Sequence, residues 1–113
     1  MKLQKFRIYL ADLNPVHGTE PGKIRPVVIV QTDLLNNEHP STVVCPTTTR
    51  IVKEVSVLRV HLSRKESGLS KDSDILIDQI RAIDNRRFLR PLGKLSVPLQ
   101  EKLLENLRLI LLE

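Results

Sequence analysis

The chain has 113 residues, a length typical of one domain, and its 41% hydrophobic content is enough for one core. Its 18 Lys and Arg residues exceed its 13 Asp and Glu residues, and the net charge of +5 favours a polyanionic partner, although a basic but functionally neutral surface stays open on charge alone. Only Phe6, Tyr9 and Phe88 are aromatic, so the stacking platforms of many RNA-binding modules are largely missing. We expect a single domain over residues 1–113.

Cys45 is the only cysteine, which excludes an intrachain disulfide and a cysteine-ligated zinc site and fits a reducing cytoplasm. It lies in an apolar run, so we expect a buried structural thiol, because reactive thiols need exposure and a positive setting. No stretch approaches the roughly 18 to 20 apolar residues of a membrane span. We therefore expect a cytoplasmic protein with no membrane association and no export signal.

In chain order, the first signals are those of short strands. Residues 6–13 predict a first strand, residues 25–31 a second and residues 41–48 a third. Residues 55–62 predict a fourth strand with a bend or bulge where the apolar alternation changes phase. Residues 74–83 are apolar on both faces, which predicts a central buried strand.

Two helical segments are expected in the second half of the chain. The polar connection 63–68 predicts a short helical turn that Gly68 ends. From Pro98 onward, leucines recur at helical spacing, and Pro98 suits the first position of the last helix. Leu109 and Leu112 widen its apolar stripe, which indicates either a face for a second subunit or a frayed last turn.

Five to six short strands with one terminal helix predict a mainly β fold with a C-terminal α-helix, a small SH3-like open barrel. Its strongest site candidate is the segment 20–30. There Glu20 lies on a loop punctuated by Gly and Pro, and Arg25 stands next to Pro26 at the start of an aliphatic strand. A fork-shaped cation beside an acid suits phosphate chemistry.

Five segments in order resemble the MazF/PemK toxins of bacterial type II toxin–antitoxin systems, over nearly the whole chain. They are residues 8–15 (IYLADLNP), 18–20 (GTE), 25–31 (RPVVIVQ), 46–48 (PTT) and 78–84 (DQIRAID). The resemblance implies an SH3-like barrel with a C-terminal helix that works as a homodimer. It also implies a metal-independent endoribonuclease, with no cofactor, that cleaves single-stranded RNA and is neutralised by a cognate antitoxin. An acidic antitoxin tail that orders on binding would compete with RNA for the cationic groove.

The implied chemistry is attack by a ribose 2′-hydroxyl on the adjacent phosphorus, which leaves a 2′,3′-cyclic phosphate and a 5′-hydroxyl. Arg25 matches the family's catalytic arginine, and Thr48 matches its catalytic threonine by position. Because a threonine hydroxyl is a poor base, we expect Thr48 to position the phosphate. Glu20 matches an acidic position and is either the proton acceptor or a solvated charge. Thr47 and Thr49 blur the threonine assignment. Strand alternation sends them to the side opposite Thr48, unless Pro46 twists that corner.

Further RNA contacts are expected around this site and on the strand at 78–84. The candidates are Lys23, His17, Thr47, Thr49, Gln79, Arg81 and Arg86. Lys23 stands where the family commonly has glycine, and Phe6-Arg7 replaces the usual Gly-Asp. For Gln79 and Arg81 a structural hydrogen-bond network is expected, with RNA contact left open. The run Arg81, Arg86, Arg87 and Arg90 predicts either a phosphate-tracking stripe or a solvated basic rim.

Two other functions stay open. One is a CcdB-like toxin on the same barrel that poisons DNA gyrase through its C-terminal helix and needs neither Arg25 nor Thr48. The other is a catalytically silent RNA-binding barrel. The joint presence of Glu20, Arg25 and Thr48 favours the endoribonuclease over both.

Overall fold

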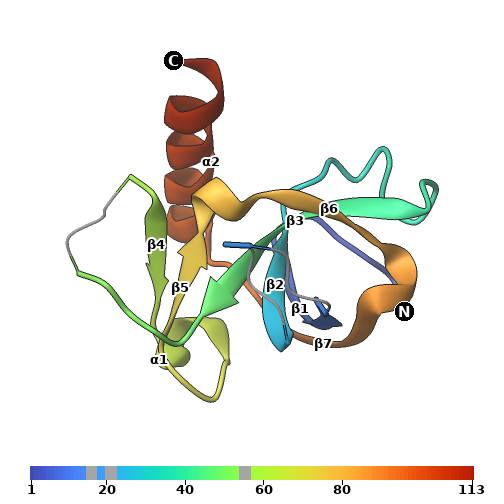
Figure 1. The fold of residues 1–113 in the computed structure, drawn as a ribbon, viewed down its shortest axis with the longest axis horizontal. Coiled ribbons are helices and arrows are strands. Elements are labelled where there is room, and N and C mark those ends of the chain that lie inside the picture. Colours follow the sequence, from blue (N-terminus) through green and yellow to red (C-terminus); the bar gives the residue numbers. More distant parts are fainter. Residues whose placement is uncertain (15–17, 20–22, 54–56) are drawn as a thin grey trace.

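The computed structural model describes residues 1–14, 18–19, 23–53 and 57–113. Its strands are β1 (Arg7–Asp12), β2 (Ile24–Ile29), β3 (Ser41–Thr48), β4 (Arg59–Leu62), β5 (Ser73–Leu76), β6 (Arg81–Asp84) and β7 (Phe88–Lys94). Its helices are α1 (Arg64–Ser67) and α2 (Val97–Leu112), with 3₁₀ turns η1 (Ile77–Gln79) and η2 (Asn85–Arg87). Figure 1 shows α2 rising beside β4 and β5, with its last turns extending past the strands.

Strand β3 connects the two parts of the sheet. The strand order is β4-β5-β3-β2-β1-β7, and β6 pairs with β3 outside this path. One edge of β3 pairs with β2, whereas its other edge pairs first with β6, over Ser41–Val44, and then with β5, at Thr47 and Thr48. All pairings are antiparallel and the sheet stays open. The predicted mainly β, open fold with a C-terminal α-helix is confirmed.

The core forms on both faces of β1, β2 and β3, because each of these strands carries apolar residues at consecutive positions. One buried cluster contains Ile8, Val28 and Cys45, and the other contains their neighbours Tyr9, Val27 and Val44. Leu103 and Leu107 of α2 join the first cluster. Cys45 is buried, as predicted, and desolvation by burial raises the pKa of its thiol to about 12.

The predicted central strand over 74–83 is wrong. This segment forms β5, the turn η1 and β6, because it pairs with two successive stretches of the same β3 edge. At η1 the Ile77 amide donates to the Leu58 carbonyl oxygen. This amide is therefore not available for a strand hydrogen bond to β3. Ile77 is buried there, and Ala82 is exposed. The apolar run therefore reflects the burial of a turn as well as of strands.

Two other predictions need correction. The fourth strand is only Arg59–Leu62, because Val57 and Leu58 lie exposed in a turn, and Val55 falls outside the described residues. Strand β7 was missed, since its interior Pro91 and Gly93 are breakers by sequence. Both are accommodated in β7, which pairs with β1 alone among the described strands and shifts its register along that pairing.

The strands expected at 6–13, 25–31 and 41–48 and the terminal helix are confirmed, with boundaries moved by at most two residues at the strand ends. The turn at 63–68 is the helix α1, which ends at Gly68 in the left-handed region with φ 78°. In α2, Leu103 and Leu107 are buried, whereas the leucines beyond them are not. The exposed leucines of α2 are Leu104, Leu109, Leu111 and Leu112.

Candidate functional site

Arg25 stands at the start of β2, opposite Ala11 of β1. It is half-buried, and its Nη1 donates to the Thr47 carbonyl oxygen at 3.3 Å. Pro26 follows it with a fixed φ and no amide hydrogen, and Val27 to Ile29 are buried. The guanidinium is therefore held between β2 and the end of β3 by a rigid strand.

The three consecutive threonines at the end of β3 have different environments. Thr47 is buried, and its hydroxyl donates to the Pro26 carbonyl oxygen at 2.8 Å, so it joins β2 to β3. Thr48 is half-buried, lies opposite Asp74 of β5, and accepts a hydrogen bond from the Arg50 amide at 3.1 Å. Thr49 is exposed. Thr47 and Thr49 line the same cavity as Arg25, whereas Thr48 is not among its lining residues. The register of β2 and β3, continued from Val27 and Pro46, nevertheless sets Thr48 opposite Arg25.

These residues surround a cavity of about 220 Å³, named here the Arg25 pocket. Its described lining residues are Lys23, Ile24, Arg25, Pro26, Thr47 and Thr49. Lys23 has φ 66°, in the left-handed region, and its amide donates to Asn14 Oδ1 at 2.9 Å. Two cations and an exposed hydroxyl around one small cavity form a setting that suits a phosphate.

Glu20 and His17 lie outside the described residues. The carboxylate expected to accept a proton and the histidine expected near it therefore keep the standing of predictions. The other two histidines, His39 and His61, are exposed.

Gln79, Arg81 and Arg86 are not part of the Arg25 pocket. Arg81 is half-buried on β6, and its Nη1 is buried without a hydrogen-bond partner in the described part of the chain. Arg86 forms two hydrogen bonds of 3.0 Å with the Asp84 carboxylate, which lower the pKa of Asp84 to about 2. Arg87 donates to the carbonyl oxygens of Asp12 and Asn14.

The predicted stripe of four arginines is thus divided in the structure. Arg86 is matched by an acid, Arg87 is bonded to backbone, and Arg81 is half-buried. Arg90 is exposed on β7.

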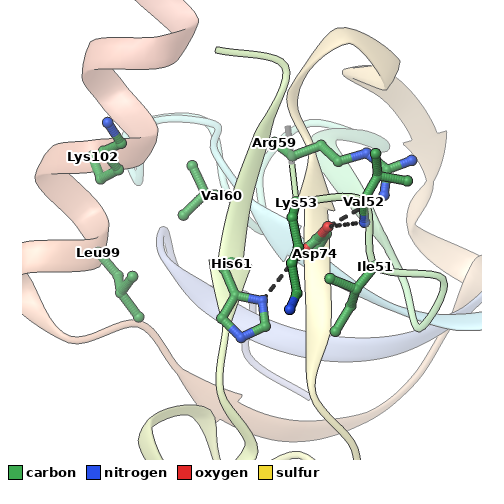
Figure 2. A pocket seen from close by; sticks show the side chains of 9 residues that line it. All are labelled: Ile51, Val52, Lys53, Arg59, Val60, His61, Asp74, Leu99 and Lys102. Carbon is green, nitrogen blue, oxygen red and sulfur yellow. Dashed lines mark hydrogen bonds and ion pairs between the residues drawn. The ribbon is translucent and has the colours of Figure 1, made fainter. Parts of the chain in front are cut away.

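A second cavity, of about 430 Å³, lies between α2, β4 and residues 51–53 and is named here the Asp74 cavity (Figure 2). It is lined by Ile51, Val52, Lys53, Arg59, Val60, His61, Asp74, Leu99 and Lys102. Asp74 has a side chain only 3% exposed. Its carboxylate accepts from Arg59 Nη1 at 3.2 Å and from the Val52 amide at 3.3 Å, and His61 Nδ1 lies 3.0 Å from it.

Asp74 therefore ties the segment that follows β3 to strands β4 and β5. Arg59 Nη1 also donates to the Arg50 carbonyl oxygen at 2.7 Å, which adds a second bond to the same segment. Asp74 was not among the site residues expected from the sequence. The sequence signal for it is an acid at the first position of the apolar segment 74–83. Such an acid is expected to be buried, and a buried carboxylate requires hydrogen-bond or ion-pair partners.

The described residues hold no group of three or more His, Cys, Asp or Glu side chains placed to ligate a metal ion. None of the helices in the described part of the chain has the length and apolar character that crossing a bilayer requires.

Comparisons with known proteins agree with this fold. The model of the PemK-like, MazF-like toxins of type II toxin–antitoxin systems matches residues 4–111. The structure of MazF from Deinococcus radiodurans is 20% identical, with a TM-score of 0.84 over 98% of this chain and 97% of that chain. The Mycobacterium tuberculosis toxin MazF-mt6 is 24% identical, with a TM-score of 0.75 over 90% of this chain and 92% of that chain. A mycobacterial endoribonuclease in complex with its cognate antitoxin is 17% identical, with a TM-score of 0.74 over 97% of this chain and 93% of that chain.

Proposed function

Because this chain belongs to the PemK-like, MazF-like toxins of type II toxin–antitoxin systems, we propose that it is a metal-independent endoribonuclease that cleaves single-stranded RNA. The observation that carries the proposal is the Arg25 pocket. It holds the arginine that matches the family's catalytic arginine, next to the threonines that end β3. Lys23 adds a second cation, so the pocket suits the charge of a phosphodiester.

The proposed reaction is an internal transfer. The 2′-oxygen bonds to phosphorus, the bond from phosphorus to the 5′-oxygen breaks, and the proton of the 2′-hydroxyl goes to a base while the leaving oxygen gains a proton. Negative charge grows on the non-bridging oxygens in the transition state, where donors that are already fixed in place stabilise it most. Arg25 supplies such donors from a rigid strand.

Thr48 is proposed as a hydrogen-bond donor to the phosphate. Its oxygen already accepts from the Arg50 amide, and a hydroxyl that accepts one bond keeps its own proton for donation. Thr49 competes for this role because it lines the Arg25 pocket. Thr48→Val and Thr49→Val remove one hydroxyl each at nearly constant shape, so kcat measured for the two variants identifies which threonine acts. Glu20 is the proposed proton acceptor.

The test is cleavage of a long single-stranded RNA by the purified protein in excess EDTA. We expect 2′,3′-cyclic phosphate and 5′-hydroxyl ends, and a loss of about 100- to 1,000-fold in rate for Arg25→Ala. Lys102→Ala is the matched control, since it removes one charge at the Asp74 cavity and should cleave normally. Full cleavage by Arg25→Ala, or loss of all cleavage in EDTA, would contradict the proposal.

We further propose that a cognate antitoxin covers the Arg25 pocket with an acidic segment. The mycobacterial endoribonuclease was solved with its antitoxin, and charge complementarity favours an acidic chain at the cations of this pocket. Antitoxin and a non-cleavable RNA should then exclude each other in a competition measured by fluorescence anisotropy. A ternary complex of toxin, antitoxin and RNA would argue against it.

We also propose a homodimer that uses the end of α2. Leu111 and Leu112 are 56% and 78% exposed, and a packed interface would remove this apolar surface from water. The double variant Leu111→Glu, Leu112→Glu should sediment as a monomer. Leu34→Glu is the control, because Leu34 is 86% exposed outside α2. A wild-type monomer at micromolar concentration would contradict the dimer.

A further inference from the structure

One row of residues crosses four strands on the face of the sheet that carries Arg25. Thr48 of β3 lies opposite Asp74 of β5, and Asp74 lies opposite His61 of β4. On the other edge of β3, the register of β2 and β3, continued from the pairs that they form, sets Thr48 opposite Arg25. Directly opposed residues of antiparallel strands share a face, so the row leads from the candidate site to His61. With strands about 4.8 Å apart, the backbones of Arg25 and His61 are about 14 Å apart along this row.

The His61 ring at the end of this row is held by Asp74 (Figure 2). Its Nδ1 lies 3.0 Å from Asp74 Oδ1, and because a carboxylate only accepts, Nδ1 carries the hydrogen of this bond. The Asp74 side chain is 3% exposed, whereas that of His61 is 53% exposed. Its Nε2 has no hydrogen-bond partner among the described residues, so the outer part of the ring is open to a ligand. A ring held in one orientation before binding loses little conformational entropy when a ligand contacts it.

The Asp74 cavity beside this ring has the size and the surface of a site for a flat, mostly apolar group. Its volume of about 430 Å³ lies within the range of about 300 to 1,000 Å³ that is usual for small-ligand sites. The segment that covers Asp74 contributes Ile51 and Val52 to its lining, and these side chains are 39% and 42% exposed. The cavity therefore offers apolar surface next to an oriented ring.

The charges around Asp74 favour a base over a phosphate at this end of the row. Arg59 Nη1 donates to the Asp74 carboxylate and to the Arg50 carbonyl oxygen, so this cation is already bonded within the protein. His61 is bonded to the same carboxylate. A phosphate beside His61 would stand close to that carboxylate, and like charges at close range repel. An uncharged base meets no such repulsion.

Stacking positions are few in the described part of the chain. Of its three aromatic side chains, Phe6 is half-buried, and Tyr9 and Phe88 are buried. His39 is exposed but precedes β3, so it lies at the end of that strand away from Thr48. His61 is therefore the exposed ring on the described part of the row. Proteins that bind single-stranded RNA stack its bases on rings of this kind.

We propose that His61 and the adjoining side of the Asp74 cavity bind one base of the single-stranded RNA, farther along the strand than the phosphate at Arg25. The base stacks on the His61 ring and packs against Ile51 and Val52. Lys102, which Figure 2 shows on α2 across β4 from Ile51, takes no part. OB folds, which are small β-barrels, cover about 4 to 16 nucleotides of a single strand, so a contact beyond the cleaved phosphate is expected. This inference rests on the proposed endoribonuclease function.

The test measures binding by fluorescence anisotropy, with an RNA that contains a mapped cleavage site and is made non-cleavable by 2′-O-methylation. His61→Ala should weaken binding about tenfold, the contribution of one stacked base. His61→Phe keeps a ring and should bind within about threefold of the wild type. The slope of log K against log salt should stay unchanged in both variants, because stacking releases no counterions. Both variants should fold, since Asp74 keeps Arg59 and the Val52 amide as partners.

A second measurement identifies the base that His61 contacts. Abasic nucleotides replace the bases of this RNA one at a time, and the replacement at the contacted position should weaken binding to the wild type about tenfold. With that RNA, His61→Ala should lose less than about twofold more, because the stacked base is already missing. This arm separates a direct contact from a general effect of the substitution on the fold.

His39→Ala is the matched control, since it removes an exposed histidine away from the row and should bind like the wild type. Unchanged affinity in His61→Ala, an equal loss in His39→Ala, or losses that add at every abasic position would overturn the base site. A slope lowered by about 0.7 in His61→Ala would also overturn it, because that value indicates a lost phosphate contact. In each case cleavage by the wild type would leave the proposed function in place. A wild-type protein that neither binds nor cleaves single-stranded RNA would overturn both.

Discussion

The Arg25 pocket and the Asp74 cavity are both lined by cations, yet the two regions use their charges in opposite ways. In the Asp74 cavity the buried carboxylate of Asp74 forms hydrogen bonds with Arg59, the Val52 amide and His61. In the Arg25 pocket the described lining contains Lys23 and Arg25 but no acid. A buried carboxylate that binds cations of other segments stabilises a loop, whereas a cavity whose described lining holds cations and no acid suits an anionic ligand. The number of cations around a cavity therefore says less about its function than the partners of those cations.

The largest effect expected from this comparison is on stability, at Asp74. Asp74→Ala leaves Arg59 without its carboxylate, and breaking a buried pair costs about 3 to 5 kcal/mol. We expect Asp74→Ala to lower the unfolding free energy, measured by urea titration, by about 3 kcal/mol. This is the lower end of that range, because the Arg59 side chain is 21% exposed. Asp74→Asn keeps an acceptor for the Val52 amide and should lose less. A stability unchanged in Asp74→Ala would mean that the ion pair contributes nothing.

A smaller effect, of opposite sign for stability and binding, is expected at Lys23. Its φ of 66° is a conformation that costs a side chain roughly 1 kcal/mol relative to glycine. Lys23→Gly should therefore raise the unfolding free energy by about 0.5 to 1 kcal/mol and weaken RNA binding. Lys23→Ala separates the two effects, because it removes the charge and keeps the strained backbone. If Lys23→Gly gains stability without losing affinity, Lys23 does not contact RNA.

The smallest effect concerns the ion pair of Asp84 and Arg86 on the surface. The two hydrogen bonds from Arg86 lower the pKa of Asp84 to about 2, so we expect its carboxyl carbon to titrate there in an NMR experiment. Since the folded pKa is lowered, the contribution to stability is present above the ordinary pKa of 3.8 and is lost as the pH falls towards 2. In Arg86→Gln the titration should return to the ordinary range. Titration near 3.8 in the wild type would leave Arg86 available to RNA.

Local patterns were enough to predict much of this molecule. The spacing of the leucines and Pro98 predicted α2, and the apolar runs predicted the first three strands, because each signal depends on neighbours in the chain. The position of Arg25 beside Pro26 likewise predicted a rigid arginine at the start of a strand. The sequence also raised the question of which threonine faces Arg25, since alternation alone separates Thr48 from Thr47 and Thr49.

Long-range pairing decided the rest. The division of residues 74–83 into two strands and a turn depends on how one edge of β3 is shared by β5 and β6, which no local pattern records. Whether an arginine side chain is paired depends on which acids and carbonyl oxygens the fold places beside it, as with Asp84 beside Arg86. By itself the sequence determined which residues are basic and which segments are apolar. Only the tertiary structure decided which cations are matched inside the protein and which line a cavity, because that depends on contacts between segments far apart in the chain.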